Sequence, residues 1–258
     1  MKSKSYEIRL FWDLLCGMTE KELKSRYKHT VFGFLWILIN PLLQMLVIGF
    51  IFRLFIKEPI SNYFYYLFCG LLVWNFFSLT LSKTTPSIVY ERSLIKKSRF
   101  PHSVIPLSII FSNAINLVIA LGLFSVPVVI NGLFDIKNIP ILLIALFLLL
   151  IFSIGISLFT SALNVRFRDV NFFVQAVLIL WFYATPIVYS ISVVPYKLMW
   201  LWRINPLTSI VQLFQFIFSG APPPGWGMLL INLSISMLFL VLGIIVFKLE
   251  SKNFDDWV

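Results

Sequence analysis

The chain has 258 residues, of which 59% are hydrophobic and only 12% are charged, with a mean hydropathy of +0.92. Soluble domains are typically about 45–50% apolar and about 25% charged, so this composition excludes an ordinary cytosolic enzyme, a disordered chain and a disulfide-stapled secreted module. It predicts a polytopic membrane protein. The net charge of +10 would suggest nucleic acid in a soluble protein, but basic cytoplasmic loops explain it here, and no nucleic-acid partner is expected.

Residues 1–30 predict a cytoplasmic amphipathic helix that lies in the headgroup plane of the membrane. Its apolar face holds Ile8, Phe11, Trp12, Leu15 and Met18, with Arg9 and Asp13 opposite. Gly17 is expected to break the helix, and Thr19 with Glu22 matches a capping box that would restart it. Whether this segment is only an anchor, or also frames a lateral opening or a docking surface, stays open.

Residues 31–250 predict an all-α transmembrane domain, followed by a cytoplasmic tail at 251–258. A bilayer core of about 30 Å takes roughly 20 apolar residues at about 1.5 Å each, and continuous apolar runs favour helices over a barrel. Six segments qualify as spans, at about 31–56, 63–81, 104–130, 139–163, 171–189 and 227–247.

The basic residues are unevenly divided between the two sides of these six spans. Sixteen of the 21 fall on the side that holds both termini. The other five are Arg53, Lys57, Lys137, Lys197 and Arg203. Because basic residues concentrate in cytoplasmic loops, both termini are predicted to lie in the cytoplasm.

The connection at 82–103 is basic and too long for a tight turn. It contains a helix-capable core from Ile88 to Lys97, bracketed by Pro86 and Pro101. Leu94 and Ile95 could pack, while the charged side chains Glu91, Arg92, Lys96 and Lys97 face water or a partner. Two interpretations remain open, a solvated positive-inside loop and a docking helix for a cytoplasmic subunit.

The outward segment at 190–226 is rich in apolar and aromatic residues. Its longest apolar run, Leu207–Phe218, is too short to span a bilayer. Backbone at membrane depth is tolerated only where protein buries it or water lines it. The segment therefore predicts short re-entrant or interfacial helices before the sixth span.

The sequence lacks the usual motifs of catalysis. It has no P-loop, no H-E-x-x-H and no G-x-S-x-G, and Cys16, Cys69, His29 and His102 are too scattered for a disulfide or a metal site. The predicted spans carry no interior Asp, Glu, Lys or His, and Arg53 near the end of the first can snorkel. We therefore expect a non-enzymatic chain without its own cofactor, driven by a separate ATPase subunit.

Aromatic residues make up 17% of the chain. Most are expected to face lipid or to form interfacial belts. A minority could line a path for a sugar polymer, because aromatic faces pack against the C–H faces of sugar rings. The candidates for a pore or exit gate are Trp36, Tyr183, Tyr189, Trp200, Trp202, Phe214 and Phe218.

Four groups of residues follow one another along the chain between about residues 6 and 250. They are Glu22–Lys28 with Gly33–Trp36 and Asn40–Leu42; Leu94–Lys97 with Phe100, Pro101 and Ile105–Leu107; Asn164 with Arg166–Asp169; and Ala184–Ile187 with Tyr189 and Asn205–Leu207. In this order, with six spans and no ATP motif, they resemble the membrane subunit of type-2 ABC polysaccharide exporters, the Wzm-like permeases for O-antigen, capsule and teichoic acid.

This resemblance implies a homodimer in the bacterial inner membrane, joined by two cytoplasmic ABC ATPase subunits that bind ATP and Mg²⁺. It implies a polymer on a polyprenyl diphosphate lipid, or a related glycolipid, as the substrate, with O-antigen-type export preferred. It also implies a coupling helix at about Ile88–Phe100. The candidates for contact with the ATPase are Glu91, Arg92, Leu94, Ile95, Lys96, Lys97, Arg99 and Phe100.

A lipid diphosphate is anionic, so basic residues at the cytoplasmic face could attract it. The candidates there are Arg26, Lys28, Arg166, Arg168 and Asp169. The cluster at 166–169 is explained equally well as a stop-transfer flank whose Arg–Asp pair pins a turn. The alternative functions are a type-2 ABC permease for drugs or small lipids, a membrane enzyme of envelope assembly, and a passive channel or structural component.

Overall fold

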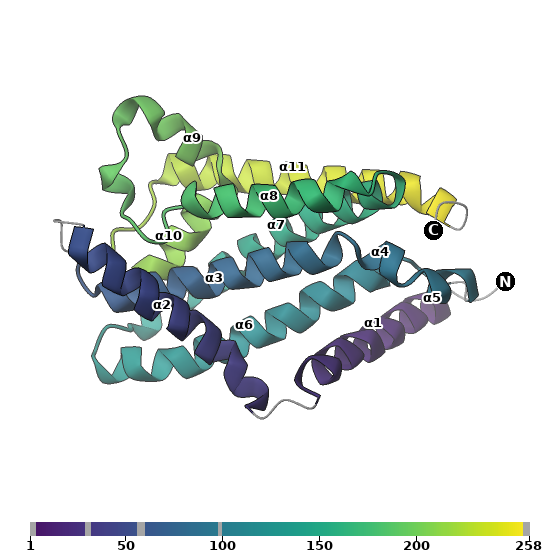
Figure 1. Cartoon of the computed structure of the whole chain (residues 1–258), viewed down its shortest axis with the longest axis horizontal. Helices are drawn as coiled ribbons and strands as arrows, with labels where there is room; N and C mark the ends of the chain where they lie inside the picture. Colours follow the sequence, from purple (N-terminus) through teal and green to yellow (C-terminus); the bar gives the residue numbers. More distant parts are fainter. Residues whose placement is uncertain (1–3, 29–31, 56–59, 98–99, 255–258) are drawn as a thin grey trace.

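The computed structural model describes residues 4–28, 32–55, 60–97 and 100–254, and throughout these residues the regular structure is helical (Figure 1). The α-helices are α1 (Lys4–Tyr27), α2 (Trp36–Phe55), α3 (Tyr63–Thr84), α4 (Ser87–Tyr90), α5 (Arg92–Lys97), α6 (Val104–Ile130), α7 (Ile139–Arg166), α8 (Asp169–Tyr183), α9 (Met199–Ile204), α10 (Pro206–Ser219) and α11 (Trp226–Glu250). Short 3-10 helices cover Gly33–Leu35, Ile136–Asn138, Ile191–Val193, Tyr196–Leu198 and Ser251–Asn253.

Within the part of the chain that the structure describes, four helical segments are long and apolar enough to cross a membrane, which supports the polytopic class. They are Tyr63–Thr84, Val104–Ile130, Ile136–Arg166 and Trp226–Asn253. The predicted first and fifth spans correspond to the shorter apolar helices α2 and α8. The count of six spans therefore stays a prediction.

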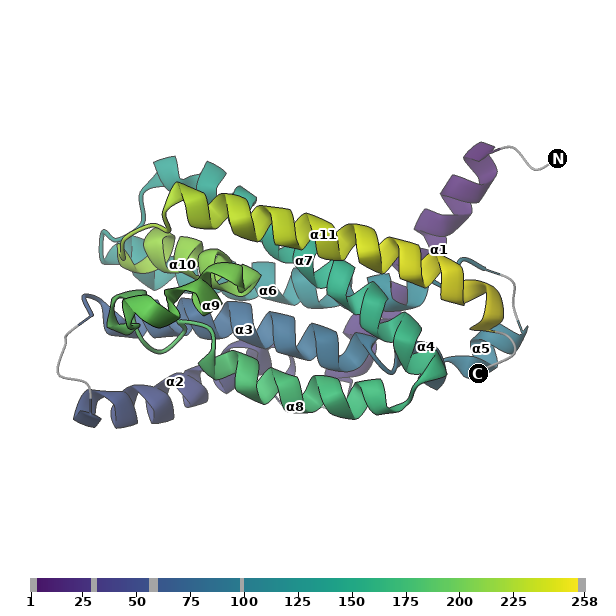
Figure 2. The same cartoon turned by 90° about the horizontal axis from the view of Figure 1, so that it is seen from above.

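The long helices α3, α6, α7 and α11 run along the long axis of the molecule (Figures 1 and 2). The fully buried rings of Phe77 and Phe152 stack between α3 and α7, with centroids 5.5 Å apart. Trp181 of α8 meets both rings edge-on. α7 and α11 cross at Gly155 and Gly243, where an added Cβ on Gly243 would overlap the Gly155 carbonyl oxygen. Only glycine permits this close approach of two backbones.

The predicted fifth span ends earlier than expected, because α8 stops at Tyr183 rather than at 189. Pro186 follows shortly after this end, and a proline disfavours helical backbone at the residue before it. α8 has 15 residues, about 22 Å at about 1.5 Å per residue, which is less than a bilayer core.

The segment at 190–226 folds into short helices, as its sequence predicted, and α10 is buried by protein. Thirteen of its 14 side chains are buried, and it packs against α3, α7 and α11. The helix begins at Asn205, whose side chain accepts from the Leu207 N–H (3.1 Å), and ends at Gly220, which has a φ of 73°. α9 and α10 lie at the end of the bundle opposite the end of α11 (Figure 2).

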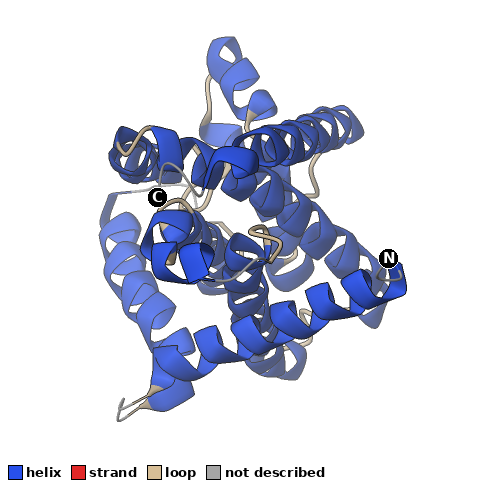
Figure 3. Cartoon of the chain, turned by 90° about the vertical axis from the view of Figure 1, so that its right-hand side faces the viewer, coloured by secondary structure: helices blue, strands red, loops and turns tan. Residues whose placement is uncertain are grey.

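The N-terminal helix differs from its prediction in two ways. α1 is continuous from Lys4 to Tyr27, so the predicted break at Gly17 is wrong: the site is open, and one exposed glycine costs a helix only about 1 kcal/mol. The predicted capping box is also wrong, because the Thr19 hydroxyl donates to the Leu15 carbonyl (2.7 Å) inside the helix. α1 packs on α6 and crosses the end of the bundle (Figure 3).

Only part of the predicted apolar face of α1 is packed. Leu15 is buried, whereas Ile8 and Trp12 are more than half exposed. The helix therefore packs on the bundle at Leu15 and leaves the apolar side chains of Ile8 and Trp12 exposed.

The basic connection at 82–103 forms two short helices, α4 and α5, rather than the single helical core predicted from Ile88 to Lys97. The chain leaves helical geometry at Glu91, which has φ −92° and ψ 23°. The start of α1 and the end of α11 lie at the same end of the bundle as α4 and α5 (Figure 1).

Candidate functional site

A groove of about 630 Å³ between α2, α3 and α8 carries a row of uncharged polar side chains. Asn75, Ser78 and Ser82 lie on one face of α3, because their spacing of three and four residues matches the helical repeat. Gln175 of α8 donates from Nε2 to the Ser82 hydroxyl (2.8 Å), and Asn75 donates from Nδ2 to Oε1 of Gln44 on α2 (3.0 Å). The row thus links three helices.

The two ends of this groove differ in character. Trp74, Phe182 and Tyr183 line it toward the end of α8. At the other end, Ser82 and Gln175 also line a cavity of about 400 Å³ at the α4 end of the bundle, where Lys83, Glu22, Glu91 and Asn171 are found. The charged cavity and the groove therefore share Ser82 and Gln175, and the lining of the groove changes from polar to aromatic toward the end of α8.

Neutral amides and hydroxyls both donate and accept hydrogen bonds. They can pair with sugar hydroxyls without a fixed charge, and such contacts release their ligand readily. A conducting path needs this combination of many sites and weak binding. The groove is suited to a neutral, hydroxyl-rich chain.

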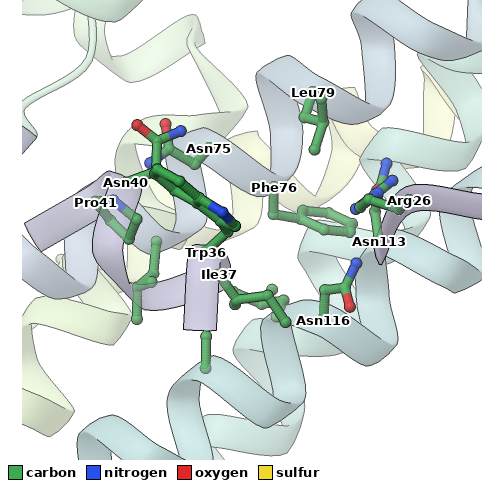
Figure 4. A pocket seen from close by; sticks show the side chains of 13 residues that line it. Arg26, Trp36, Ile37, Asn40, Pro41, Asn75, Phe76, Leu79, Asn113 and Asn116 are labelled. Atoms are coloured by element: carbon green, nitrogen blue, oxygen red, sulfur yellow. The ribbon is translucent and has the colours of Figure 1, made fainter. Parts of the chain in front are cut away.

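A second cavity, of about 350 Å³, lies between α2, α3 and α6 (Figure 4). Arg26, in the last turn of α1, contributes to its wall and donates from Nη2 to Oδ1 of Asn113 on α6. Asn113 in turn donates from Nδ2 to the Thr80 hydroxyl (3.0 Å). Asn116, about one turn further along α6, lines the same cavity. A cation and two buried amides of α6 thus meet at one place.

The five residues predicted to meet an anionic lipid are distributed over several elements. Arg26 lines the cavity just described, and Arg166 forms an ion pair of 3.9 Å with Glu250 of α11. Lys28, Arg168 and Asp169 are exposed. Asp169 stands in the first turn of α8, where a carboxylate interacts favourably with the helix dipole.

The neighbouring motif residue Asn164 has a clear structural role. Its buried Oδ1 accepts from the Asn171 N–H (3.1 Å). This bond ties the end of α7 to the first turn of α8.

The predicted coupling segment is held by a small apolar core. Ile88 of α4 and Ile95 of α5 are buried, and they belong to a cluster with Ile105, Phe247 and Phe254. These residues come from α4, α5, α6, α11 and the segment after it. The cluster also includes side chains of α7, so the segment packs against three helices of the bundle, α6, α7 and α11.

The polar side of this segment faces outward. Glu91 accepts from Lys21 of α1 at 3.2 Å, which joins α1 to the turn between α4 and α5. Arg92 and Lys96 are exposed, whereas Leu94 and Phe100 are partly buried. The side chain of Lys97 and the whole of Arg99 lie outside the described residues.

The predicted pore aromatics divide into three groups. The first group is accessible: Trp36 lines the cavity, Tyr183 lines the groove, and Trp200 is exposed on α9. The second group, Trp202 and Tyr189, is joined by hydrogen bonds. Trp202 donates from Nε1 to the Tyr189 hydroxyl (2.9 Å), which itself donates to the Tyr183 carbonyl (2.7 Å).

Phe214 and Phe218 form the third group, and they are buried in the core of the bundle at 0% and 1% exposure. Phe218 packs against Phe124 and Phe134. A side chain without exposed surface cannot line a path, so the pore prediction for these two residues is wrong in this conformation. Their spacing on α10 identifies an apolar face of the helix. A single sequence does not say whether such a face packs against protein or lines an open path.

Sequence reasoning missed the polar side chains Asn75, Ser78, Ser82 and Gln175 of the groove, and it missed Asn113 and Asn116. Asn40, which lines both spaces, belonged to the first group of motif residues. A signal for the missed residues was present. Polar residues inside apolar spans are rare and usually face the interior or a water-filled space. The prediction from sequence rested on ionisable residues alone, and these amides and hydroxyls are not ionisable.

Comparisons with known proteins agree on one family. Residues 13–219 match the family described as ABC-2 type transporter. An O-antigen export system permease protein RfbA of Klebsiella pneumoniae is 37% identical over 222 residues, which cover 83% of each chain. A second protein of that name and organism is 34% identical over 217 residues, again 83% of each chain.

A third relative extends the similarity over almost the whole chain. The O-antigen export system permease protein RfbA of Myxococcus xanthus is 30% identical over 252 residues, 97% of each chain. The resemblance to permeases of polysaccharide exporters, drawn from the four groups of motif residues, is thereby confirmed. The chain belongs to the ABC-2 type transporter family.

Proposed function

We propose that this chain is the permease subunit of an ATP-driven exporter that moves a lipid-linked, O-antigen-type polysaccharide from the cytoplasmic to the outer side of the bacterial inner membrane. The observation that carries the proposal is the groove between α2, α3 and α8, whose polar row is uncharged. The relatives named as O-antigen export permeases support the same substrate class.

The proposed assembly is a homodimer with six spans per chain, both termini in the cytoplasm, and a path between the two protomers. One protomer leaves the groove open on one side. α8 presents Phe172, Phe173 and Leu180 at about 70% exposure, and α2 presents Val47 and Phe50 at above 60%. A second copy placed over these helices would close the groove and cover part of this apolar surface.

Energy in this proposal comes from two cytoplasmic ABC ATPase subunits, which bind ATP and Mg²⁺. They would contact α4 and α5 through the exposed side chains of Arg92 and Lys96. Motion would pass through buried Ile88 and Ile95 to the long helices. This chain itself would bind no cofactor and perform no catalysis.

The groove is tested by replacing two of its polar side chains with apolar ones of similar size. In cells that make the cognate polymer, the double variant Asn75→Leu with Gln175→Leu should lower surface polysaccharide at least tenfold. The matched control is Leu238→Gln on the exposed face of α11, away from the groove and from the proposed contact between protomers, which should lower it less than twofold. A loss in the control as large as that in the double variant would show that the effect does not depend on the groove.

The assembly is tested by purifying the tagged chain in mild detergent. A P-loop ATPase in stoichiometric amount, together with glycolipid, is the expected result. Unchanged export in the double groove variant would contradict the proposed path. ATPase stimulation by lipid that carries no glycan would favour the alternative of a permease for small lipids.

A further inference from the structure

The cavity between α2, α3 and α6 contains a buried amide that the fold leaves without a partner. Asn116 is 6% exposed, and neither its Nδ2 nor its Oδ1 has a hydrogen-bond partner. Buried polar groups in proteins are almost always hydrogen-bonded. Among the described residues, Asn116 is the one buried amide with both atoms unpartnered, so the fold alone does not explain it.

Arg26, which lines the same cavity, gives the same indication. Its Nη2 is used by Asn113, but its Nε is buried without a partner. Figure 4 shows Arg26 against Asn113, with Asn116 beside them. A guanidinium and an amide NH₂ that converge on one space form a donor set for an oxyanion.

The charges around this place favour an anion as the ligand. Lys83 lies near enough to Arg26 for the two cations to interact, and Glu22 interacts with Lys83. Glu91 at the same end is paired with Lys21, so Arg26 and Lys83 against Glu22 leave a net positive charge. Phosphate suits this setting better than a neutral sugar, because Arg pairs with phosphate in a bidentate geometry.

The surroundings of the cavity indicate how a ligand reaches it. Trp36, Asn40 and Leu79 line the cavity and are exposed, so it reaches the protein surface. Apolar side chains flank it one turn away on both neighbouring helices, with Leu43 on α2 and Ile119 on α6 exposed. A ligand with an anionic head and an apolar tail matches this combination.

We infer that this cavity binds the phosphate group of a membrane lipid, with Arg26 pairing its charge and Nδ2 of Asn116 donating to a second phosphate oxygen. The inference rests on the proposed function only in placing these helices in a membrane. The phosphate is common to two sources, the diphosphate of a transported polyprenyl lipid and the head of a resident phospholipid.

The test measures binding to the delipidated full chain in detergent by isothermal titration. The probes are a short prenyl diphosphate, dioctanoyl phosphatidylglycerol and inorganic phosphate. Arg26→Gln should lower the association constant of the lipid probes at least tenfold, and Asn116→Leu at least threefold. The matched control is Lys24→Gln on the same helix, whose ammonium pairs with Glu20 in the exposed i,i+4 geometry.

Each outcome decides a part of the inference. Unchanged lipid binding in Arg26→Gln overturns it, and so does an equal loss in Lys24→Gln, which would show general charge attraction. Inorganic phosphate that binds as tightly as the lipids overturns the lipid assignment. A prenyl diphosphate that binds tenfold tighter than phosphatidylglycerol assigns the site to the transported lipid, and the reverse order assigns it to a resident phospholipid.

Two further measurements separate the site from folding and from transport. Arg26→Lys should recover part of the affinity, because it restores the charge but not the forked geometry. Binding is measured without ATP or a partner subunit, so a failure here leaves the exporter proposal standing. Conversely, intact lipid binding without export would count against the exporter alone.

Discussion

Two buried asparagines of this protein show opposite relations to their surroundings. Asn205, at the start of α10, accepts from the Leu207 N–H and from Nε1 of Trp181 (3.1 and 2.9 Å). Its Nδ2 donates to the Ala184 carbonyl (3.1 Å) and to the Thr185 hydroxyl (3.0 Å). Its hydrogen-bonding capacity is therefore used fully within the fold.

Asn116, in contrast, makes none of these bonds although it is as deeply buried. The difference teaches how to separate a structural polar residue from a functional one. Asn205 joins the end of α8 to the start of α10, and its burial is explained by that junction. Asn116 has no such explanation, and a ligand supplies one.

The largest loss of stability is expected at the contact between α7 and α11, away from both asparagines. It sets the scale against which the two asparagine variants are judged. In Gly243→Ala the new Cβ would overlap the backbone oxygen of Gly155, and neither backbone can move away without separating α7 from α11. We expect a loss of more than about 4 kcal/mol of unfolding free energy, or no folded protein. The yield of monodisperse protein in detergent measures this.

Gly227→Ala is the matched control, because an added Cβ there meets nothing within 4 Å. It should have little effect on yield. Normal folding of Gly243→Ala would mean that α7 and α11 are farther apart than described. A folding defect of this kind lowers lipid binding together with yield, which distinguishes it from a change at Asn116.

The next largest effect concerns the satisfied asparagine. Asn205→Leu removes four hydrogen bonds and leaves the Trp181 indole and the Leu207 N–H without their partner. We expect destabilisation on the order of 3 kcal/mol, measured as a lower unfolding midpoint in detergent. Asn131→Leu, the same change at an exposed site on the end of α6, should cost less than about 1 kcal/mol. Equal unfolding midpoints for the two variants would mean that the hydrogen bonds of Asn205 do not stabilise the fold.

The sequence predicted the apolar segments well, because long uncharged windows leave few alternatives to a membrane helix. It did not distinguish Asn205 from Asn116, since the partners of Asn205 come from Trp181 and Ala184, more than 20 residues away. Only the folded chain shows which buried amide is satisfied.

The pore prediction for Phe214 and Phe218 disagrees with the packing for a related reason. Phe214 and Tyr183 have similar apolar neighbours in the sequence, yet one is fully buried and the other is 70% exposed. Helical spacing identifies an apolar face, but packing decides whether that face meets protein or open space. The predicted helix break at Gly17 was wrong because the loss of helix propensity at one glycine, about 1 kcal/mol, is smaller than the free energy gained by packing α1 on α6.

The unsatisfied asparagine should respond in the opposite direction from the satisfied one. Asn116→Leu replaces a buried amide without partners by an apolar side chain of similar volume, so we expect unchanged stability or a gain of about 1 kcal/mol. The unfolding midpoint without added lipid measures this. A clear destabilisation, comparable with that of Asn205→Leu, would show that Asn116 is a structural residue after all.

The smallest effect on stability concerns the link between α1, which carries Arg26, and the segment of α4 and α5. Lys21 pairs with Glu91 at 3.2 Å, but the lysine side chain is 61% exposed. Such pairs contribute less than about 1 kcal/mol, so Glu91→Gln should barely move the unfolding midpoint. If this link carries motion from the ATPase to α1, the variant should still lower glycolipid-stimulated ATPase activity of the complex. The control Glu20→Gln removes the pair with Lys24 within α1. It should leave the ATPase activity unchanged, because that pair joins no second helix. Equal activity in both variants would mean that the Lys21–Glu91 pair is a surface contact without a role in coupling.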